Sequence, residues 1–129
     1  MLTEEVVLKA PDRPDTLRNV FGALARAHVE TLGLATERYT ESGGPFRRIR
    51  FLFRDRTEGA AALKNEGYSV RVNQVVYLQV EASVARLDWA IHRLDDAGIK
   101  VETVYHAYAP GGPGLVIVCE NAEKASEIL

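Results

Sequence analysis

The sequence contains very little cysteine and no long hydrophobic run. Cys119 is the one cysteine among 129 residues, so an internal disulfide cannot form and a reducing compartment is expected. The longest aliphatic run, residues 115–118, is far shorter than the roughly 20 apolar residues that a membrane-spanning helix needs. Glu4 and Glu5 stand where a signal peptide would carry positive charge. We therefore expect a cytoplasmic protein that does not associate with a membrane.

Neither sign of charge is in marked excess. The chain has 16 Lys and Arg residues against 18 Asp and Glu residues, which gives a formal net charge of −2. This near balance argues against a protein that binds nucleic acid or other polyanions through its overall charge. A hydrophobic fraction of 47% excludes a disordered chain. The length suits one ordinary domain, or two very small ones that share a core.

Patterns typical of catalysis and metal binding are also missing. His28, His92 and His106 are far apart in the sequence and show none of the spacings of metal ligands. No nucleophile and base, and no pair of carboxylates, stand at a spacing useful for catalysis. The glycine-rich residues 110–114 lack the Gly-Lys-Ser/Thr ending of a phosphate-binding loop, so they indicate a hairpin turn. Cys119 alternates with apolar neighbours and is expected to be a buried, inert thiol. We expect no metal, no cofactor and no enzymatic activity.

The first half of the chain predicts the order strand, helix, strand, strand, helix, strand. Residues 4–10 are typical of a strand, and Pro14 suits the first turn of a helix because its fixed φ angle matches that position. Apolar residues then recur at steps of three and four, which indicates an amphipathic helix that contains Leu17, Val20, Phe21, Leu24 and Ala27. The remaining expected elements are strands at residues 33–40, 46–54 and 68–73, and a helix from Asp55 to Lys64 that begins with a capping box and ends before Gly67.

Along the strand at residues 46–54, apolar side chains, two of them aromatic, alternate with side chains that are mostly arginines. In an RNA-recognition motif the aromatic residues lie on the open face of the sheet, where bases stack on them. Here the aromatic residues share a face with an isoleucine, and the Gly-Phe-(Gly/Ala)-Phe-Val pattern is absent. We therefore expect a core covered by helices on one face, and a solvated or self-associating face on the other, with no nucleic acid bound. The first face carries Ile49, Phe51 and Phe53, and the second carries Arg48, Arg50, Leu52 and Arg54.

The second half of the chain repeats the pattern of the first. Leu17 and Leu87 are 70 residues apart, and slow drift in the spacing of the other pairs is what a diverged repeat shows. We predict two tightly coupled units, residues 1–73 and residues 74–129, of which the second lacks its last strand. The elements expected in the second unit are strands at residues 75–82, 99–108 and 115–120, a helix from Val84 to Ala97, and a last helix that begins after Asn121.

One strand of the second half is apolar on both faces. Val116 and Val118 lie opposite Ile117, so both faces should be buried. One face would pack on helices, and the other needs cover from the partner unit or from another chain. We predict a homodimer formed through this open sheet face. Trp89 lies off the apolar stripe of its helix, which fits an interface residue and a partly packed residue equally well.

The most specific signal lies in residues 7–17, Val-Leu-Lys-Ala-Pro-Asp-Arg-Pro-Asp-Thr-Leu. This segment resembles the strand followed by Asp-(Arg/Lys)-Pro-Gly-x-Leu of the ACT domain, a small-ligand regulatory module found on enzymes of amino-acid metabolism. Two βαββαβ units with a glycine-rich hairpin extend the resemblance over the whole chain, which is most similar to stand-alone proteins with two tandem ACT repeats. The resemblance implies an α+β fold of two ferredoxin-like βαββαβ (ACT) repeats side by side, with helices mainly on one face of an antiparallel sheet.

The resemblance also implies a function. Such proteins are non-enzymatic allosteric regulators, which bind a small effector, here an amino acid, at the interface of two ACT units and act on a metabolic enzyme. A helix N-terminus suits the carboxylate of such a ligand, and nearby carboxylates suit its ammonium group. Carried onto this chain, the ligand-binding residues are Asp12, Arg13, Pro14, Asp15 and Thr16 in the first repeat and Ser83, Val84, Ala85 and Arg86 in the second. Tyr105 and His106 stand on a strand that borders this predicted crevice, which fits a ligand contact as well as a half-buried strand position.

Asp15 departs from the pattern of the family. The family has glycine at this position, which lets the backbone approach the ligand, whereas an added carboxylate would repel a ligand carboxylate. The second repeat has no Asp-x-Pro-Gly sequence at all. The alternative interpretation is therefore a structural or interaction subunit that keeps the ACT fold and has lost its ligand.

Overall fold

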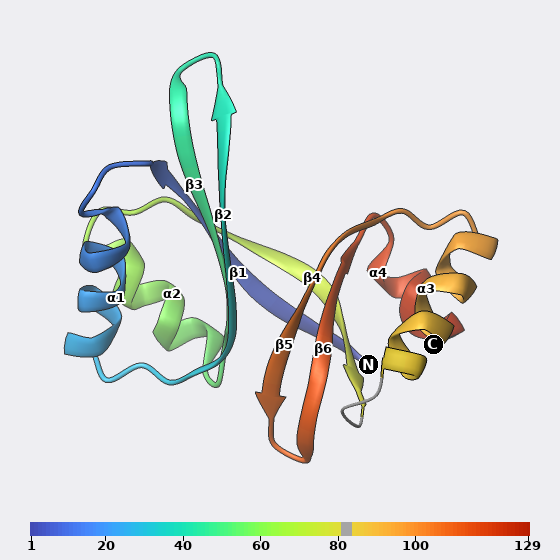
Figure 1. Cartoon of the computed structure of the whole chain (residues 1–129). Coiled ribbons are helices and arrows are strands. Elements are labelled where there is room, and N and C mark those ends of the chain that lie inside the picture. Colours follow the sequence, from blue (N-terminus) through green and yellow to red (C-terminus); the bar gives the residue numbers. More distant parts are fainter. Residues whose placement is uncertain (81–83) are drawn as a thin grey trace. The chain divides into compact units, whose positions relative to one another are not determined.

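In a computed structural model that describes residues 1–80 and 84–129, the chain forms two compact units (Figure 1). The N-terminal unit is Glu5–Asn73, and the C-terminal unit combines Met1–Glu4 with Gln74–Leu129. The described residues contain six strands and four helices, and every strand pair with an assigned register is antiparallel. The α+β class that the sequence predicts is confirmed.

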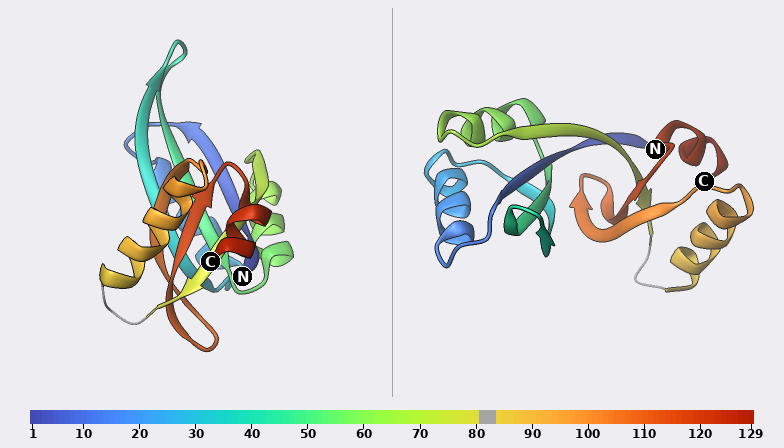
Figure 2. Two further views of the ribbon diagram at one scale, coloured as in Figure 1. Left: turned by 90° about the vertical axis from the view of Figure 1, so that its right-hand side faces the viewer. Right: turned by 90° about the horizontal axis from the view of Figure 1, so that it is seen from above.

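The N-terminal unit places both of its helices on one side of its strands (Figures 1 and 2). β3 lies in the middle and pairs antiparallel with β1 and with β2, and β4 lies beside β1. The order of the strands is therefore β4-β1-β3-β2. The elements are β1 (Leu2–Pro11), α1 (Thr16–Arg26), β2 (Thr31–Glu41), β3 (Gly44–Phe53), α2 (Arg56–Asn65) and β4 (Val70–Gln79), with the first residues of β1 and the last of β4 belonging to the C-terminal unit.

Local sequence signals fix where α2 begins and ends. Asp55 precedes the helix, and its carboxylate accepts a hydrogen bond from the Glu58 backbone N–H over 3.1 Å, which satisfies a donor that the helix leaves unpaired. Gly67 follows the helix with a φ of +88°, a conformation that glycine adopts without steric cost. Both features agree with the sequence prediction for this helix.

The core of the N-terminal unit is built on the apolar face of β3. Ile49 and Phe51 are fully buried, and Phe53 is nearly so. The Phe51 and Phe53 rings stack at 4.9 Å between centroids, and Phe21 of α1 meets Phe51 edge-on at 6.3 Å. The predicted division of this strand into an apolar, helix-covered face and an opposite arginine face is confirmed.

The C-terminal unit has β6 between β4 and β5, and both pairs are antiparallel. The chain start completes its sheet: the Tyr77 N–H donates to the Met1 carbonyl over 2.8 Å, and the Met1 amino group donates to the Tyr77 carbonyl over 3.3 Å. Among the described residues no strand follows α4, as the sequence predicts for the second unit, and Met1–Glu4 lies along β4 in the place of the missing strand. Its other elements are α3 (Val84–Asp96), β5 (Val101–Ala109), β6 (Gly112–Cys119) and α4 (Ala122–Ile128).

β4 differs from the prediction because it is one continuous strand, Val70–Gln79. The sequence pattern predicts two separate strands here, residues 68–73 in the first unit and residues 75–82 in the second. No glycine or proline interrupts the chain between Ser69 and Val80, so nothing ends the first strand before the second begins. β4 thus contributes residues to both units, as β1 does.

Both faces of β6 are buried. Val116 is 0% exposed and Val118 is 1% exposed, and Ile117 on the other face is also buried, so the prediction that both faces are buried is confirmed. These side chains are buried within a single chain, and their burial alone does not require a second copy. Trp89 of α3 is half-buried and packs against the core, with Arg86 and Arg93 over its ring at 4.1 and 5.3 Å.

The helices are short. The longest of those in the described residues, α3, has 13 residues, and none of them combines the length and apolar character that crossing a bilayer requires.

Candidate functional site

The turn between β1 and α1, where the sequence predicts a ligand site, is held in place by backbone and hydroxyl contacts. The Asp12 N–H donates to the Pro45 carbonyl over 3.0 Å. The Thr16 hydroxyl donates to the Pro11 carbonyl over 2.7 Å and accepts from the Arg13 N–H over 2.9 Å. Thr16 is 7% exposed, so it lies beneath the turn and fixes its shape rather than facing a ligand.

Asp12 is the electrostatic centre of this turn. Its carboxylate contacts Arg38 Nε over 2.6 Å and Arg47 Nη2 over 3.4 Å, and its side chain is only 14% exposed. Arg38 and Arg47 stand directly opposite each other on β2 and β3, where two like charges would repel each other. The carboxylate of Asp12 offsets that repulsion and holds both guanidinium groups at the turn.

A pocket of about 360 Å³ opens at this turn. Its volume is in the range of small-molecule sites. Three guanidinium groups and one carboxylate line it, so it carries net positive charge with one acidic group among the basic ones. Such an arrangement suits a ligand that has a carboxylate and a nearby ammonium group. The lining residues are Asp12, Arg13, Pro14, Leu17, Arg38 and Arg47.

Asp15 lies at the N-terminus of α1 but does not cap it with its side chain. Its carboxylate instead accepts a hydrogen bond from the Asn19 amide over 3.2 Å, and it is not among the residues that line the pocket. Of the five residues predicted in this turn, the structure therefore brings Asp12, Arg13 and Pro14 together at one pocket.

Sequence reasoning missed Arg38 and Arg47 as parts of this site. Their side chains reach Asp12 only because β2 and β3 pair in one particular register, and that register is not visible in local periodicity. The signal that could have found them is a pair of arginines placed to face each other across a predicted hairpin, because such a pair requires a nearby carboxylate.

The residues predicted in the second half do not form a comparable cluster. Val84, Ala85 and Arg86 are exposed in the first turn of α3, and Arg86 stacks on Trp89. Tyr105 and His106 are neighbours on β5, so they point to opposite faces, and Tyr105 is buried whereas His106 is exposed. Ser83 lies outside the described residues.

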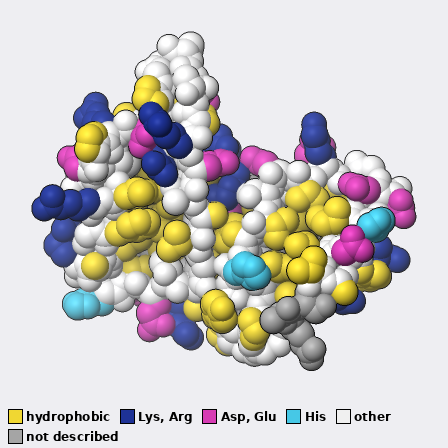
Figure 3. Space-filling view, in the orientation of Figure 1, with side chains coloured by type: hydrophobic (Ala, Val, Ile, Leu, Met, Phe, Trp, Pro, Cys, Tyr) yellow, Lys and Arg dark blue, Asp and Glu magenta, His cyan; other side chains and the backbone are white. Residues whose placement is uncertain are grey.

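Arg48 of β3 and Arg54, which directly follows β3, are paired with carboxylates. Arg48 contacts Glu37 over 2.7 Å, and Arg54 contacts Glu30 over 2.6 Å. Figure 3 shows basic and acidic side chains next to each other over this unit. Among residues 1–80 and 84–129, no three His, Cys, Asp or Glu side chains are grouped closely enough to hold a metal ion.

Arg50 differs from the other arginines because it is buried. It is 2% exposed, and its Nη1 donates to Glu5 Oε2 over 2.6 Å. The prediction of a solvated arginine face is therefore wrong at this position. Burial of a charge requires a charged partner, and Glu5 supplies it from β1.

Cys119 is half-buried at the end of β6 rather than fully buried as predicted. Burial raises the pKa of its thiol, and the Asn121 N–H lowers it to a smaller extent. Because the thiolate is the reactive form, we expect iodoacetamide at neutral pH to modify Cys119 several-fold more slowly in the native protein than in urea. Mass spectrometry over time measures both rates, and equal rates would contradict this prediction.

No family model matches the chain, and no curated protein matches it. Among solved structures, it is similar to protein BT0572 from Bacteroides thetaiotaomicron, with 22% identity and a TM-score of 0.76 over 100% of this chain and 87% of that chain. It is also similar to the ligand-free regulatory subunit of aspartate kinase from Thermus thermophilus, with 17% identity and a TM-score of 0.61 over 99% and 92% of the two chains. Aspartate kinase from Synechocystis matches 98% of this chain with 25% of its own length, at 19% identity and a TM-score of 0.60. At these identities the likeness shows a shared fold.

Proposed function

We propose that this protein is a non-enzymatic regulatory module with tandem ACT repeats, which binds an amino acid in the pocket at the β1–α1 turn. The observation that carries the proposal is the placement of Asp12 between Arg38 and Arg47, at the turn where the ACT resemblance locates the ligand. The fold it shares with a regulatory subunit of aspartate kinase supports a regulatory role and a metabolic enzyme as the regulated partner.

The chemistry of the pocket fits the two charged groups of an amino acid. The guanidinium groups of Arg13 and Arg47 offer donors in a planar fork that matches a carboxylate. Asp12 uses one oxygen for Arg38 and the other for Arg47, and each carboxylate oxygen can accept a further hydrogen bond from an ammonium group. Leu17 adds an apolar wall for the side chain of the ligand. A ligand that binds one conformation more tightly than another would shift the population toward it.

The first test is a thermal shift measurement with each of the twenty amino acids. A ligand that binds only the folded protein raises its Tm, so at least one amino acid is expected to raise it at millimolar concentration. If none does, the amino-acid proposal fails. The alternative, a structural subunit without a ligand, would then be favoured, and Asp15 in place of the family glycine already points in that direction.

The residue to change is Arg47. We expect Arg47→Gln to weaken binding of the stabilising amino acid by about tenfold or more, because a hydrogen bond to a charged group contributes about 1.5–3 kcal/mol. Arg54→Gln is the matched control, since Arg54 directly follows β3, pairs with Glu30 and does not line the pocket. Isothermal titration calorimetry measures both affinities. If Arg47→Gln and Arg54→Gln bind the amino acid with equal affinity, the ligand does not bind in the pocket at the β1–α1 turn.

The proposal includes a homodimer. Light scattering at micromolar concentration, with and without the stabilising amino acid, measures the mass directly. A monomeric mass under both conditions would remove the dimer from the proposal and leave the ligand site untouched.

A further inference from the structure

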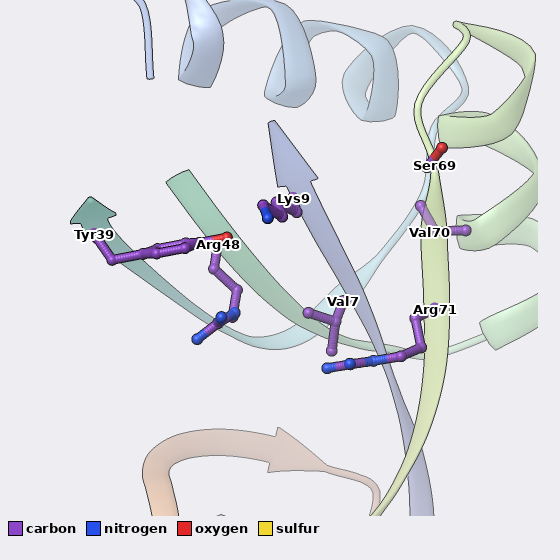
Figure 4. Close-up of a pocket in the computed structure, with 7 residues that line it drawn as sticks. All are labelled: Val7, Lys9, Tyr39, Arg48, Ser69, Val70 and Arg71. Carbon is purple, nitrogen blue, oxygen red and sulfur yellow. The ribbon is translucent and has the colours of Figure 1, made fainter. Parts of the chain in front are cut away.

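A second cavity lies on the face of the N-terminal unit's sheet opposite to the face that carries Phe51 and Arg47 (Figure 4). It has a volume of about 360 Å³ and is lined by strands β1, β2 and β3 and by residues 69–71 at the start of β4. Successive residues of a strand point to opposite faces, so Arg47 belongs to the pocket at the turn and Arg48 to this second cavity. The proposed function assigns no role to this second cavity.

Positive charge exceeds negative charge around this cavity. Lys9, Arg48 and Arg71 line it, and two of them have acidic partners: Lys9 contacts Glu41 over 2.6 Å and Arg48 contacts Glu37 over 2.7 Å. Glu41 also raises the pKa of Lys9 through its hydrogen bond and its charge, so Lys9 remains protonated at neutral pH. Within the part of the chain that the structure describes, Arg71 pairs with no carboxylate, and Figure 4 shows it extending toward Val7. The cavity thus has one positive charge that is not balanced by an acidic partner.

Tyr39 provides a hydrogen-bond donor at the same place. Its ring points from β2 toward the middle of the cavity (Figure 4). Its hydroxyl oxygen is buried beside the Lys9 ammonium, which is only a donor, and the hydroxyl hydrogen has no acceptor among the described residues. A buried hydroxyl that makes no hydrogen bond is unfavourable. An acceptor atom brought by a ligand would satisfy it.

The Tyr39 ring is held firmly in this position. It stacks beside the Phe46 ring at 6.0 Å, and the Arg48 guanidinium lies over it at 4.5 Å. Because a cation already covers its face, the ring does not offer the open surface on which a nucleic-acid base stacks. This geometry favours a small molecule that uses the hydroxyl over a nucleic acid that uses the ring.

We propose that this cavity binds a small organic anion. Its carboxylate or phosphate group interacts with the Arg71 guanidinium and accepts a hydrogen bond from the Tyr39 hydroxyl, while its apolar part lies against Val7 and Val70. The bound anion supplies both groups that the cavity lacks, a negative charge for Arg71 and an acceptor for Tyr39. Lys9 and Arg48 add positive potential, and Glu41 and Glu37 keep them in place.

Titration calorimetry on the full chain at constant ionic strength tests this inference, with pyrophosphate, glutarate and chloride as probes. We expect pyrophosphate or glutarate to bind and chloride not to bind, and the stronger of the two identifies the anionic group as phosphate or carboxylate. Arg71→Gln is expected to weaken binding about tenfold or more. Arg18→Gln, which removes the same charge from an exposed position of α1, is expected to leave it unchanged.

Tyr39→Phe separates ligand binding from a purely structural role of the hydroxyl. The variant keeps the ring and removes an unsatisfied buried group, so its Tm without ligand is expected to stay the same or rise, while its affinity for the anion falls. A fall in Tm with unchanged affinity would overturn the assignment of the hydroxyl to the ligand.

Three results would overturn the inference. The first is that neither pyrophosphate nor glutarate binds at concentrations up to about 1 mM. The second is that Arg71→Gln and Arg18→Gln weaken the affinity for the anion equally. The third is that a single-stranded oligonucleotide binds when neither pyrophosphate nor glutarate does. The test is independent of the proposed amino-acid site, because Arg71→Gln should retain amino-acid binding and Arg47→Gln should retain anion binding.

Discussion

Glu5→Gln is expected to lower the free energy of unfolding by about 3–5 kcal/mol. Glu5 is 0% exposed and Arg50 is 2% exposed, and their side chains meet at 2.6 Å. The Asn73 amide donates to the same Glu5 oxygen over 3.0 Å. Glutamine keeps the shape of the side chain but removes its negative charge. The Arg50 guanidinium then remains buried beside a neutral amide, which compensates its charge poorly.

Urea denaturation followed by circular dichroism measures this loss, and Glu30→Gln is its matched control. Glu30 also contacts an arginine of the β3 end, Arg54, over 2.6 Å, but these two side chains are 67% and 54% exposed. An exposed ion pair contributes about 0–1 kcal/mol, so the control should lose little. If Glu5→Gln and Glu30→Gln lower the free energy of unfolding by the same amount, burial does not determine how much the Glu5–Arg50 pair contributes to stability.

A double replacement, Glu5→Leu with Arg50→Met, separates the loss of the pair from the loss of one partner. Removing both charges leaves no uncompensated ion, and apolar side chains of similar size are often tolerated in place of a buried ion pair. We expect the double variant to be more stable than Glu5→Gln. A double variant less stable than the single one would show that the pair itself contributes net stability.

The sequence predicted what depends on neighbouring residues. Asp55 and Asn121 accept the backbone hydrogen bonds that begin α2 and α4, because the capping side chain and the donor it satisfies are three residues apart. The alternation along β3 predicted that Phe51 and Arg50 face opposite ways, since that follows from strand geometry alone. Such features need no knowledge of the rest of the fold.

The sequence did not predict what depends on distant residues. Arg50 was expected to be solvated because its partner, Glu5, is 45 residues away along the chain. The cover for the free edge of β4 comes from Met1, which is 76 residues from Tyr77. Neither pairing leaves a periodic pattern in the sequence.

At the candidate site, too, the sequence predicted what depends on neighbouring residues and not what depends on distant ones. The β1–α1 turn was located from residues 7–17 alone, and Asp12 and Arg13 do line a pocket there. Arg38 and Arg47, which supply most of the positive charge at that pocket, reach it through the register of β2 and β3. The anion cavity on the other face was missed entirely, because it combines residues from four strands.

Gly59→Ala is expected to destabilise the protein by about 1–3 kcal/mol, although alanine favours a helix more than glycine does. Gly59 lies within α2, and a methyl group added there would overlap the ring of Phe53. That ring cannot move away easily, because it is 5% exposed and stacks on Phe51 at 4.9 Å. The steric cost therefore exceeds the gain of about 0.5–1 kcal/mol from helix propensity.

Gly22→Ala should have the opposite effect and serves as the control. Gly22 lies within α1, and the nearest atom to an added methyl group is Arg26 Nη1 at 3.2 Å. This atom is the end of an exposed, flexible side chain, so it can move at little cost and the helix propensity of alanine is gained. Thermal denaturation should thus show a lower Tm for Gly59→Ala and an equal or higher Tm for Gly22→Ala. If Gly59→Ala also raised the Tm, the Phe53 ring would have room to move, and the tight packing of α2 on β3 would be contradicted.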